Sequence, residues 1–358
     1  MNRSELQDLI NEHLTPSLRW GWVDLREPLS LKHYDAWLAS GHHGEMQYLV
    51  QHRDLKAQPQ SYAPFAKSAM LFAFPYFPAK SQTALRTALY ARSEPDRVDY
   101  HASLPRRLSS LVNVLKEKCP DQEFRICVDS SPLLERDLAV RAGLGWVGKN
   151  TCVLDRQGGS LFFIVEVLSS IAAPPNPAED VAELKVPRDF CGTCTRCMDI
   201  CPTQAIIEPR VLDARLCISY WTIESKGIAP KDLRDKFQAW FFGCDLCQTV
   251  CPWNEKVFGR EAMRELTSCE LTPQGRAEMI TELRELLQLS KSQINRRYRG
   301  TPLQRSGAWG LKRNALYVIS NLKLHELFPE VQRLSADPSL GELATLAQDC
   351  LQEMQAPQ

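Results

Sequence analysis

The stretch CGTCTRCMDICP, residues 191–202, brings four cysteines together within eleven residues. Two residues separate each of the first three cysteines, three residues precede the fourth, and a proline follows it. This is the spacing of iron–sulfur ligands in bacterial ferredoxins. Zinc is the main alternative, but a structural zinc site needs only two cysteine pairs. The run therefore favours an iron–sulfur ligand set over a zinc site or a disulfide cluster.

A second run, CDLCQTVCP at residues 244–252, repeats the pattern with one cysteine fewer. Cys217 stands alone between the two runs and brings the number of thiols in this region to eight. Eight thiolates suit two 4Fe–4S clusters, and in two-cluster ferredoxins the last cysteine of a run ligates the other cluster. This crossover rule assigns cluster 1 to Cys191, Cys194, Cys197 and Cys251, and cluster 2 to Cys201, Cys217, Cys244 and Cys247.

The composition is that of an ordinary globular protein, with 44% hydrophobic and 24% charged residues. Basic and acidic residues each number 43, so net charge alone indicates no polyanionic partner. No apolar stretch approaches the ~18 residues of a membrane span, and the N-terminal MNRSELQDLINEHL lacks the apolar core of a signal peptide. We expect a cytoplasmic protein with no membrane association, in which clustered cysteines are metal ligands rather than disulfides.

The 358 residues suffice for two or three domains. A mixed α/β part comes first, with a predicted buried strand at 68–77, an amphipathic helix at 102–119 and strand candidates at 123–129, 150–155 and 158–171. It ends at the proline-rich AAPPNPAED, and the cysteine-rich module follows to about residue 260. The remainder is predicted to be wholly helical, either as a few α-solenoid repeats or as a plain helical cap.

The size of the chain indicates whether the two clusters pass electrons to a site within the same protein. Two clusters close together form a one-electron relay, and a relay alone would be a ferredoxin-like carrier. The α/β part and the helical part are far larger than a carrier needs. We therefore expect a site that accepts electrons within the α/β part.

The stretch VDSSPLLERDLAVRAGLGWVGKN, residues 128–150, places Asp129 after a predicted strand and before a predicted helix at 133–145. One interpretation makes Asp129 a cap of that helix. The other makes it a general acid facing a cofactor pocket, since ligands bind at strand ends in α/β folds. The glycines of GLGWVG follow a helix rather than a strand, which disfavours a Rossmann site and favours a loop lying against a large ligand.

Residues 291–313 read KSQINRRYRGTPLQRSGAWGLKR and hold seven basic side chains and no acidic one. Such a run is either a solvated helix face or a phosphate-binding surface, on which Tyr298 and Trp309 are available for stacking or packing. The basic residues are Lys291, Arg296, Arg297, Arg299, Arg305, Lys312 and Arg313.

Taken in order, VDSSPLLERDLAVRAGLGWVGKN, CGTCTRCMDICPTQAI, CISYWTIESKG and GCDLCQTVCPWN resemble the epoxyqueuosine reductases, and GTPLQRSGAWGLKRNALYVISN continues the resemblance. The resemblance implies an α+β multidomain fold. It would comprise an α/β cobalamin-binding catalytic domain (1–175), a bacterial ferredoxin-like double 4Fe–4S domain (176–260) and a C-terminal α-helical domain of HEAT-like repeats that binds tRNA (261–358). The implied reaction reduces the epoxide of epoxyqueuosine, at the wobble position of a tRNA anticodon, to the cyclopentene of queuosine.

The resemblance also assigns roles to residues. Asp129 matches the proton donor of the family, and Lys56 stands where the family usually has arginine. Cobalamin contacts are implied at Lys56, Tyr100, His101, Asp129, Asn150, Val153, Ile164, Ser219 and Trp221. Contacts with the tRNA anticodon stem-loop are expected at Arg296, Arg297, Arg299, Arg305, Lys312 and Arg313. A ferredoxin or flavodoxin would supply electrons to a monomeric enzyme.

Two other functions remain open from the residues. One is a corrinoid and iron–sulfur reductase of a small molecule, similar to the reductive dehalogenases, and the other is a non-catalytic ferredoxin-type electron carrier. The basic stretch at 291–313 favours a tRNA substrate over the small molecule. The size of the α/β part and the place of Asp129 disfavour the carrier.

Overall fold

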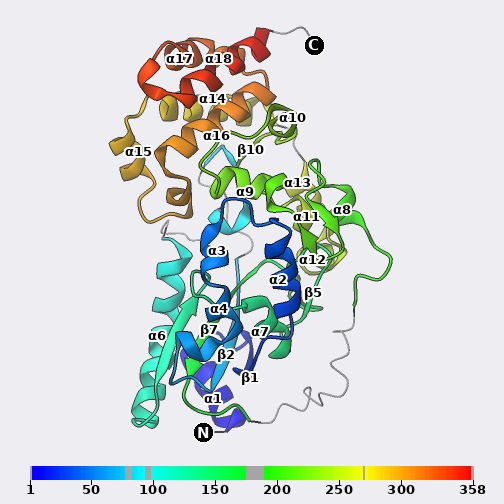
Figure 1. Cartoon of the computed structure of the whole chain (residues 1–358), viewed down its shortest axis with the longest axis vertical. Coiled ribbons are helices and arrows are strands. Elements are labelled where there is room, and N and C mark those ends of the chain that lie inside the picture. Colours follow the sequence, from blue (N-terminus) through cyan, green and yellow to red (C-terminus); the bar gives the residue numbers. More distant parts are fainter. Residues whose placement is uncertain (1, 77–82, 93–97, 175–188, 269–270, 356–358) are drawn as a thin grey trace.

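The computed structural model describes residues 2–76, 83–92, 98–174, 189–268 and 271–355. The chain runs from an N-terminal part built on one main sheet, through the cysteine-bearing part, to a stack of helices at the opposite end (Figure 1). The N- and C-termini lie at these two ends (Figure 1). Most of the proline-rich boundary predicted around residue 175 falls outside the described residues.

The main sheet has four strands in the order β1-β2-β7-β4, and each strand is antiparallel to its neighbours. The strands are β1 (Arg19–Asp24), β2 (Ser68–Pro75), β4 (Phe124–Val128) and β7 (Phe162–Ser169). β2 is buried along all but its last residue, because helices cover both faces of the sheet. The strands predicted from the apolar runs at 68–77, 123–129 and 158–171 are confirmed.

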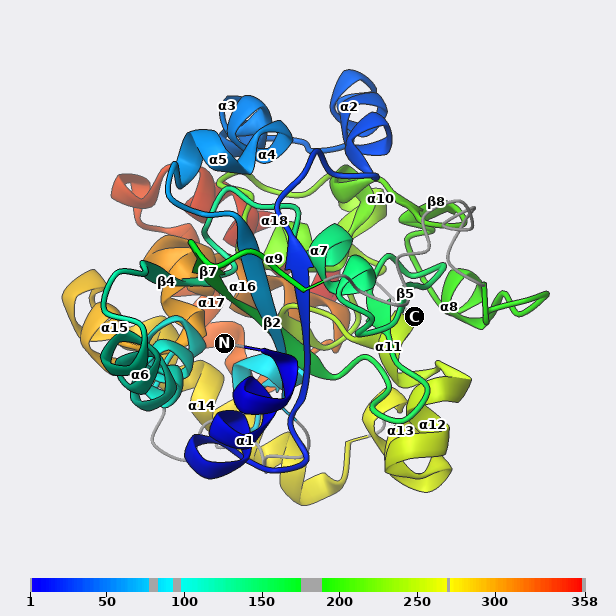
Figure 2. The same cartoon turned by 90° about the horizontal axis from the view of Figure 1, so that it is seen from below.

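Helices α1 (Arg3–His13) and α6 (Tyr100–Lys118) cover one face of the sheet, and α7 (Glu135–Arg141) covers the other (Figure 2). Side chains alternate between the two faces along each strand. Phe72 therefore packs with α1 and α6, whereas the next residue back, Leu71, packs on the α7 side.

Short elements complete the N-terminal part. Between the first two strands lie α2 (Leu31–Ala39), α3 (Gln47–Gln51), α4 (Arg53–Ala57) and α5 (Pro59–Tyr62). β3 (Arg86–Thr87) and the 3-10 helix η1 (Leu89–Arg92) precede α6, and the hairpin of β5 (Trp146–Val147) and β6 (Val153–Leu154) follows α7.

The cysteine-bearing part consists of short helices and two small strand pairs. Its helices are α8 (Arg196–Asp199), η3 (Ala214–Leu216), α9 (Ile218–Ile223), α10 (Lys231–Arg234), α11 (Leu246–Thr249) and α12 (Pro252–Phe258). Its strands are β8 (Ile206–Glu208), β9 (Val211–Leu212) and β10 (Trp240–Phe242). β10 pairs in parallel with β3, so this part is joined to the N-terminal part through a shared sheet.

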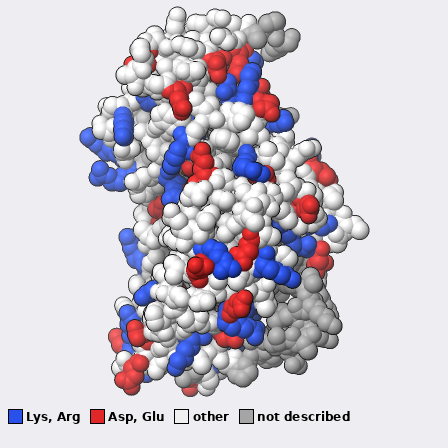
Figure 3. All heavy atoms as spheres, in the orientation of Figure 1, with Lys and Arg blue, Asp and Glu red and all other residues white. Residues whose placement is uncertain are grey.

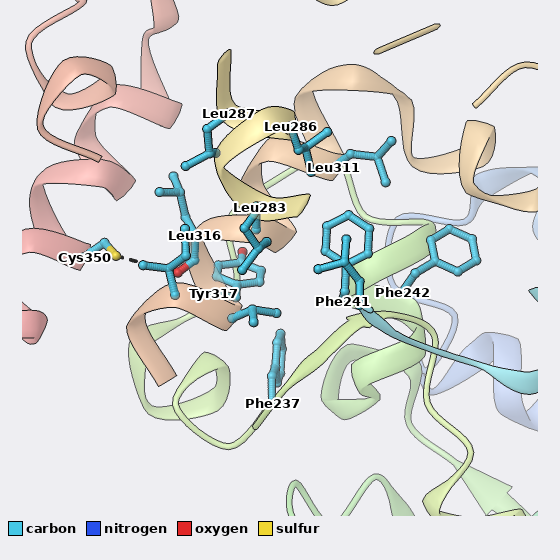
Figure 4. Packing of buried hydrophobic residues seen from close by; sticks show 14 of the residues in the cluster. Phe237, Phe241, Phe242, Leu283, Leu286, Leu287, Leu311, Leu316, Tyr317 and Cys350 are labelled. Atoms are coloured by element: carbon cyan, nitrogen blue, oxygen red, sulfur yellow. Dashed lines mark hydrogen bonds between the residues drawn. The ribbon is translucent and has the colours of Figure 1, made fainter. Parts of the chain in front are cut away.

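The remaining residues are helical, as predicted. They form α13 (Arg260–Thr267), α14 (Pro273–Gln288), α15 (Lys291–Arg297), η4 (Pro302–Ser306), α16 (Gly307–Asn321), η5 (His325–Leu327), α17 (Phe328–Ser335), η6 (Pro338–Leu340) and α18 (Glu342–Gln355). α16 is the buried centre of this stack. Phe237 and Phe241 of the cysteine-bearing part pack with Leu283, Leu311 and Tyr317 of the stack in one continuous core (Figure 4).

Among the described residues, no helix combines the length and the apolar character needed to cross a membrane.

Candidate functional site

Four of the predicted ligands lie together although one comes from a distant run. Burial and, after it, the neighbouring thiols of Cys251, Cys191 and Cys194 raise the pKa of the Cys197 thiol to about 11. Cys251 in turn has Cys191 and Cys194 as its electrostatic neighbours. The structure thus brings together the four thiols that the crossover rule assigns to cluster 1, here called the first cysteine group.

The other four thiols form a second cysteine group. Burial raises the pKa of Cys244 well above its ordinary value, with Cys217 and Cys201 also contributing. The pKa of Cys247 is likewise raised chiefly by burial, and Cys244 and Cys217 are among its neighbours. The grouping follows the crossover rule, and ligation of a cluster by each group stays a prediction.

The backbone around both groups suits iron–sulfur clusters, whose sulfur ligands usually accept N–H hydrogen bonds. The amide of Ala205 donates to the Cys201 sulfur at 3.3 Å. Backbone amides also donate to Cys217, Cys244 and Cys251. Within the described ranges, no three His, Cys, Asp or Glu side chains converge closely enough to hold a single metal ion. Two groups of four thiols with N–H donors fit two cubane clusters.

The loop that follows the glycine-rich stretch GLGWVG contacts both cysteine runs through Lys149 and Asn150. Lys149 Nζ donates to the carbonyl oxygens of Gly192 at 2.7 Å and Cys194 at 2.9 Å. Asn150 Nδ2 donates to the carbonyl oxygen of Cys247 at 3.1 Å. One loop of the N-terminal part therefore fixes both runs.

The glycines before this loop allow close packing within the N-terminal part. A Cβ on Gly145 would lie 2.0 Å from the Leu154 carbonyl oxygen, and one on Gly148 would lie 2.3 Å from the Leu154 side chain. These glycines allow the two strands of the β5–β6 hairpin to approach each other. The expectation that this loop lies against a large ligand stays a prediction.

Asp129 lies directly after β4 in a left-handed backbone conformation, with φ of 47°. Aspartate is among the few residues that tolerate this region. Helix α7 begins at Glu135 with Leu134 at its N-cap, so the interpretation of Asp129 as a helix cap is wrong. The Asp129 side chain instead accepts a hydrogen bond from Tyr100 Oη at 2.8 Å and contacts His101 Nε2 at 3.2 Å.

His101 lies between two carboxylates. Its Nδ1 is 2.7 Å from Oδ1 of Asp99, the N-cap of α6, while its Nε2 contacts Asp129. Hydrogen bonds to Asp129 and Asp99 raise the pKa of His101 to about 9. Burial raises the pKa of Asp129, but the hydrogen bonds from His101 and Tyr100 outweigh it and the net shift is downward. At neutral pH the pair therefore holds one proton, on His101.

Asp129 and the side chains around it, Tyr100, His101 and Phe163, are here called the Asp129 recess. The Asp129 side chain keeps 58% of its surface exposed, although desolvation is the largest influence on its pKa. One wall is aromatic, because Tyr100 stacks on Phe163 with ring centroids 4.4 Å apart and meets Tyr90 edge-on at 5.9 Å. An exposed acid beside a wall of rings fits a large, partly apolar cofactor.

The residues implied as cobalamin contacts differ in how deeply they are buried. Tyr100, His101 and Asp129 line the recess, and Ser219 and Trp221 lie on α9 next to Cys217. Lys56 is 9% exposed and donates to the Leu133 carbonyl oxygen at 2.8 Å. The side chains of Asn150 and Val153 are buried, and Ile164 is half-buried. Their contacts with a cofactor stay predictions.

Tyr48 and Glu224 were not found from the sequence, where no motif marks them. Arg305 pairs with Glu224, at 2.7 Å between Nη2 and Oε2, and its guanidinium lies 5.8 Å from the centroid of the Tyr48 ring. Burial raises the pKa of Tyr48 to about 12, and Glu224 and Asp129 are among the charges that add to it. Tyr48 of α3 and Arg305 of η4 are therefore electrostatic neighbours of Asp129, and Glu224, the C-cap of α9, pairs with Arg305.

The basic stretch divides into exposed and buried members. Arg313 is 0% exposed, and its guanidinium donates to the carbonyl oxygens of Ser225 and Gly227, at 2.7 Å each. The prediction that Arg313 contacts tRNA is therefore wrong, because residue 313 falls on the inner face of α16. The half-buried Lys312 donates to the Leu287 carbonyl oxygen at 3.0 Å.

The outer members of the stretch lie on and after α15. Arg297 pairs with Glu285 at 3.0 Å, whereas Lys291, Arg296 and Arg299 are exposed and make no ion pair among the described residues. Lysine and arginine side chains gather over α15 at the left of the molecule (Figure 3). These three side chains are the ones best placed to meet phosphates.

Comparison with known proteins adds a second line of evidence. Residues 190–254 match a family model described as a 4Fe-4S double cluster binding domain, and residues 56–130 match one described as Epoxyqueuosine reductase QueG, DUF1730. The epoxyqueuosine reductase of Cyclobacterium marinum is 36% identical over 79% of this chain and 86% of that protein. The one from Xanthomonas campestris is 38% identical over 81% of this chain and 79% of that protein.

Solved structures agree with these relatives. A crystal structure of an epoxyqueuosine reductase with an epoxyqueuosine-modified tRNA stem loop aligns with a TM-score of 0.77 at 26% identity, over 99% of this chain and 91% of that chain. The enzyme from Streptococcus thermophilus has a TM-score of 0.76 at 22% identity and shares the fold. The chain therefore belongs to the epoxyqueuosine reductase family of oxidoreductases and carries a double 4Fe–4S cluster domain at residues 190–254.

Proposed function

We propose that this chain reduces the epoxide of epoxyqueuosine, at the wobble position of a tRNA anticodon, to the cyclopentene of queuosine. The observation that carries the proposal is the Asp129–His101 pair, which holds one proton at the open Asp129 recess in a member of this family. An alkoxide is a poor leaving group, and a positioned acid contributes about 10²–10⁴-fold to such a step.

The recess is proposed to hold cobalamin. Bound there, cobalamin would supply a strongly reducing cobalt centre for cleavage of the carbon–oxygen bond. Tyr100 and His101 would line its pocket from α6, Ser219 and Trp221 from α9, and Asn150 and Val153 from the β5–β6 region. Lys56 and Ile164 would complete the pocket. The protein itself would orient the substrate, exclude water and keep the proton of the Asp129–His101 pair beside the epoxide oxygen.

Electrons are proposed to enter at the first cysteine group and leave from the second. The second group is proposed to be the one nearer to the recess, because Cys244 lies two residues after Phe242 of β10, whose ring centroid lies 6.3 Å from that of Tyr90. Tyr90 in turn meets Tyr100, which donates to Asp129. An external ferredoxin or flavodoxin would deliver single electrons to the first group.

The tRNA anticodon stem-loop is proposed to lie between α15 and the recess. Arg296 and Arg299 would contact phosphates, Arg297 would do so at the expense of its ion pair, and Lys312 would contribute from its half-buried place. Arg305 stands next to the recess and would contact the nucleotide nearest Asp129. A relative solved with a modified tRNA stem loop supports this substrate over a small molecule.

The domain organisation follows from these roles. We infer a cobalamin-binding domain at 1–175, a ferredoxin-like domain at 176–260 and a HEAT-like tRNA-binding domain at 261–358. We propose that the enzyme acts on tRNA in the cytoplasm as a monomer.

The decisive experiment uses tRNA from a strain that lacks this enzyme. The purified protein, reconstituted with iron, sulfide and cobalamin under anaerobic conditions, should convert epoxyqueuosine to queuosine in that tRNA, as measured by nucleoside mass spectrometry. Asp129→Asn keeps the left-handed backbone accessible and should lower the rate by about 10²-fold or more with unchanged iron content. Full activity of the Asn variant would refute the role of Asp129, and no conversion by the wild-type protein would refute the function.

A further inference from the structure

The proposed reaction needs more protons than the Asp129–His101 pair holds. Conversion of an epoxide to an alkene breaks two carbon–oxygen bonds, forms one carbon–carbon double bond, consumes two electrons and two protons, and releases one water. The pair carries one proton at neutral pH. A second proton must reach the same oxygen when the second bond breaks, while cofactor and substrate cover the recess.

Glu166 is a buried acid that no step described so far uses. It lies in the middle of β7, opposite Leu71 of β2 and Cys127 of β4, and is 0% exposed. Val165 and Val167 face α6, so the alternation of the strand directs Glu166 to the α7 side of the sheet. Neither of its carboxylate oxygens has a hydrogen-bond partner on another described residue.

Glu135, the first residue of α7, is an electrostatic neighbour of both Glu166 and Asp129. The backbone N–H of Asp129 interacts with the Glu135 carboxylate, and Glu166 and Glu135 are electrostatic neighbours. Oε1 of Glu135 is also buried without a hydrogen-bond partner among the described residues. Glu135 and Glu166 are thus two acids in the neighbourhood of the Asp129 carboxylate.

Both glutamates are expected to be neutral at physiological pH. An ionised carboxylate without a partner costs several kcal/mol to bury, so such a group keeps its proton instead. Burial, reinforced by the Asp129 charge, raises the pKa of Glu135 to about 8, and burial raises that of Glu166 well above its ordinary value. The charged and titratable groups facing them are Asp129, Lys56, Arg136 and Cys127. Of these, only Lys56 and Arg136 favour ionisation.

We propose that Glu135 and Glu166 form a proton reserve behind Asp129 that supplies the second proton of the reaction. This inference rests on the proposed function. After the first carbon–oxygen bond breaks and the oxygen takes the proton of the Asp129–His101 pair, Glu135 reprotonates Asp129 and Glu166 reprotonates Glu135. Asp129 then protonates the hydroxyl group as the second bond breaks, and water leaves. Glu135 and Glu166 are positioning residues in this scheme, since only Asp129 meets the substrate.

The first test needs no activity. Infrared spectra of the cluster-loaded protein at pH 7 should contain the carbonyl stretch of protonated carboxyl groups, and Glu166→Gln and Glu135→Gln should each remove part of that signal. Glu117→Gln, at an exposed position of α6, is the control that should leave it intact. Absence of the signal from the wild-type protein, or its full persistence in both variants, would overturn the proposal. If one variant does not fold, the other carries the test.

The second test is the pH dependence of epoxyqueuosine reduction. Glu166→Gln should match the wild-type rate near pH 6, where protons are abundant, and fall roughly tenfold below it near pH 8.5. Glu166→Asp should restore much of the rate because it again carries a transferable proton. A merely structural role would lower the rate equally at all pH values and would refute the reserve. Wild-type protein that shows the infrared signal but no reductase activity would refute the proposed function instead.

Discussion

His101 Nε2 lies 3.2 Å from Asp129 Oδ2, and this contact joins the start of α6 to the end of β4. Alone, an aspartate with a pKa of ~3.9 would be ionised at neutral pH, and a histidine with a pKa of ~6.5 would be mostly neutral. Together with Asp99 they hold a proton at neutral pH that neither would hold separately. The acidic proton of the Asp129 recess is therefore held by the Asp129–His101 pair and not by Asp129 alone.

The first prediction concerns the pH at which this pair loses its proton. Wild-type activity should fall as the pH rises through about 9, where His101 deprotonates. In His101→Gln, Asp129 alone carries the proton, so activity at pH 7.5 should fall by tenfold or more and recover toward acid pH. Rates measured from pH 5 to 10 test this.

Asp99→Asn, which removes one of the two carboxylates raising the pKa of His101, should shift the fall in activity to an intermediate pH. A His101→Gln profile that follows the wild type would contradict the assignment.

A second prediction concerns stability. The pKa of Glu135 is about 8 in the folded protein and ~4.3 in an unfolded chain, so the folded state binds the proton more tightly. Its contribution to stability is therefore complete below pH ~4.3 and is lost as the pH rises through about 8. Glu135→Gln should make the melting temperature less sensitive to pH between 5 and 8.5 than it is in the wild type. Glu117→Gln should keep the wild-type slope, and an unchanged slope in Glu135→Gln would show that Glu135 is not buried as a neutral acid.

The crossover of cysteines between the two runs leads to a third prediction. Cys201 lies within the first run but belongs to the second group, with Cys217 and Cys244. Cys201→Ala should therefore damage the second cluster and leave the first largely intact, whereas Cys197→Ala should do the reverse. Iron content together with electron paramagnetic resonance of the reduced protein distinguishes the two clusters. Equal damage to both clusters in both variants would contradict the grouping.

The fourth prediction concerns tRNA. Arg296→Ala with Arg299→Ala should weaken tRNA binding and make the plot of log affinity against log salt shallower, by about 0.7 to 0.9 for each phosphate that the protein no longer neutralises. Iron content should not change. Arg333→Ala is the control, because this side chain is 64% exposed on α17. A double variant that binds tRNA like the control across a salt series would exclude this surface.

Local patterns in the sequence predicted the features that depend on residue spacing, namely the grouping of the cysteines and the strands of the main sheet. The spacing of cysteines determines which thiols face one cluster, and the structure groups Cys251 with the first run as the crossover rule requires. The apolar runs predicted the strands of the main sheet, because a strand covered on both faces must be apolar along its whole length. The side of the sheet on which each residue falls also follows from the period of two.

Properties that depend on tertiary packing could not be predicted. Charge patterning gave no sign that Arg313 lies on the inner face of α16 and bonds to backbone carbonyls. Tyr48 meets Arg305 only because distant helices fold together. Glu166 did carry a signal, since a lone carboxylate inside the apolar run FFIVEVL must be buried, and buried acids are often functional.

The shared core of the cysteine-bearing and helical parts has a mechanical consequence. Phe237 and Phe241 are buried among the side chains of α14 and α16, so the iron–sulfur region and the helical stack share one hydrophobic core. We expect a tRNA bound beside α15 to be held at a fixed distance from the two cysteine groups. Cutting the chain near residue 260 should therefore yield two insoluble fragments, because each would expose apolar side chains of the shared core.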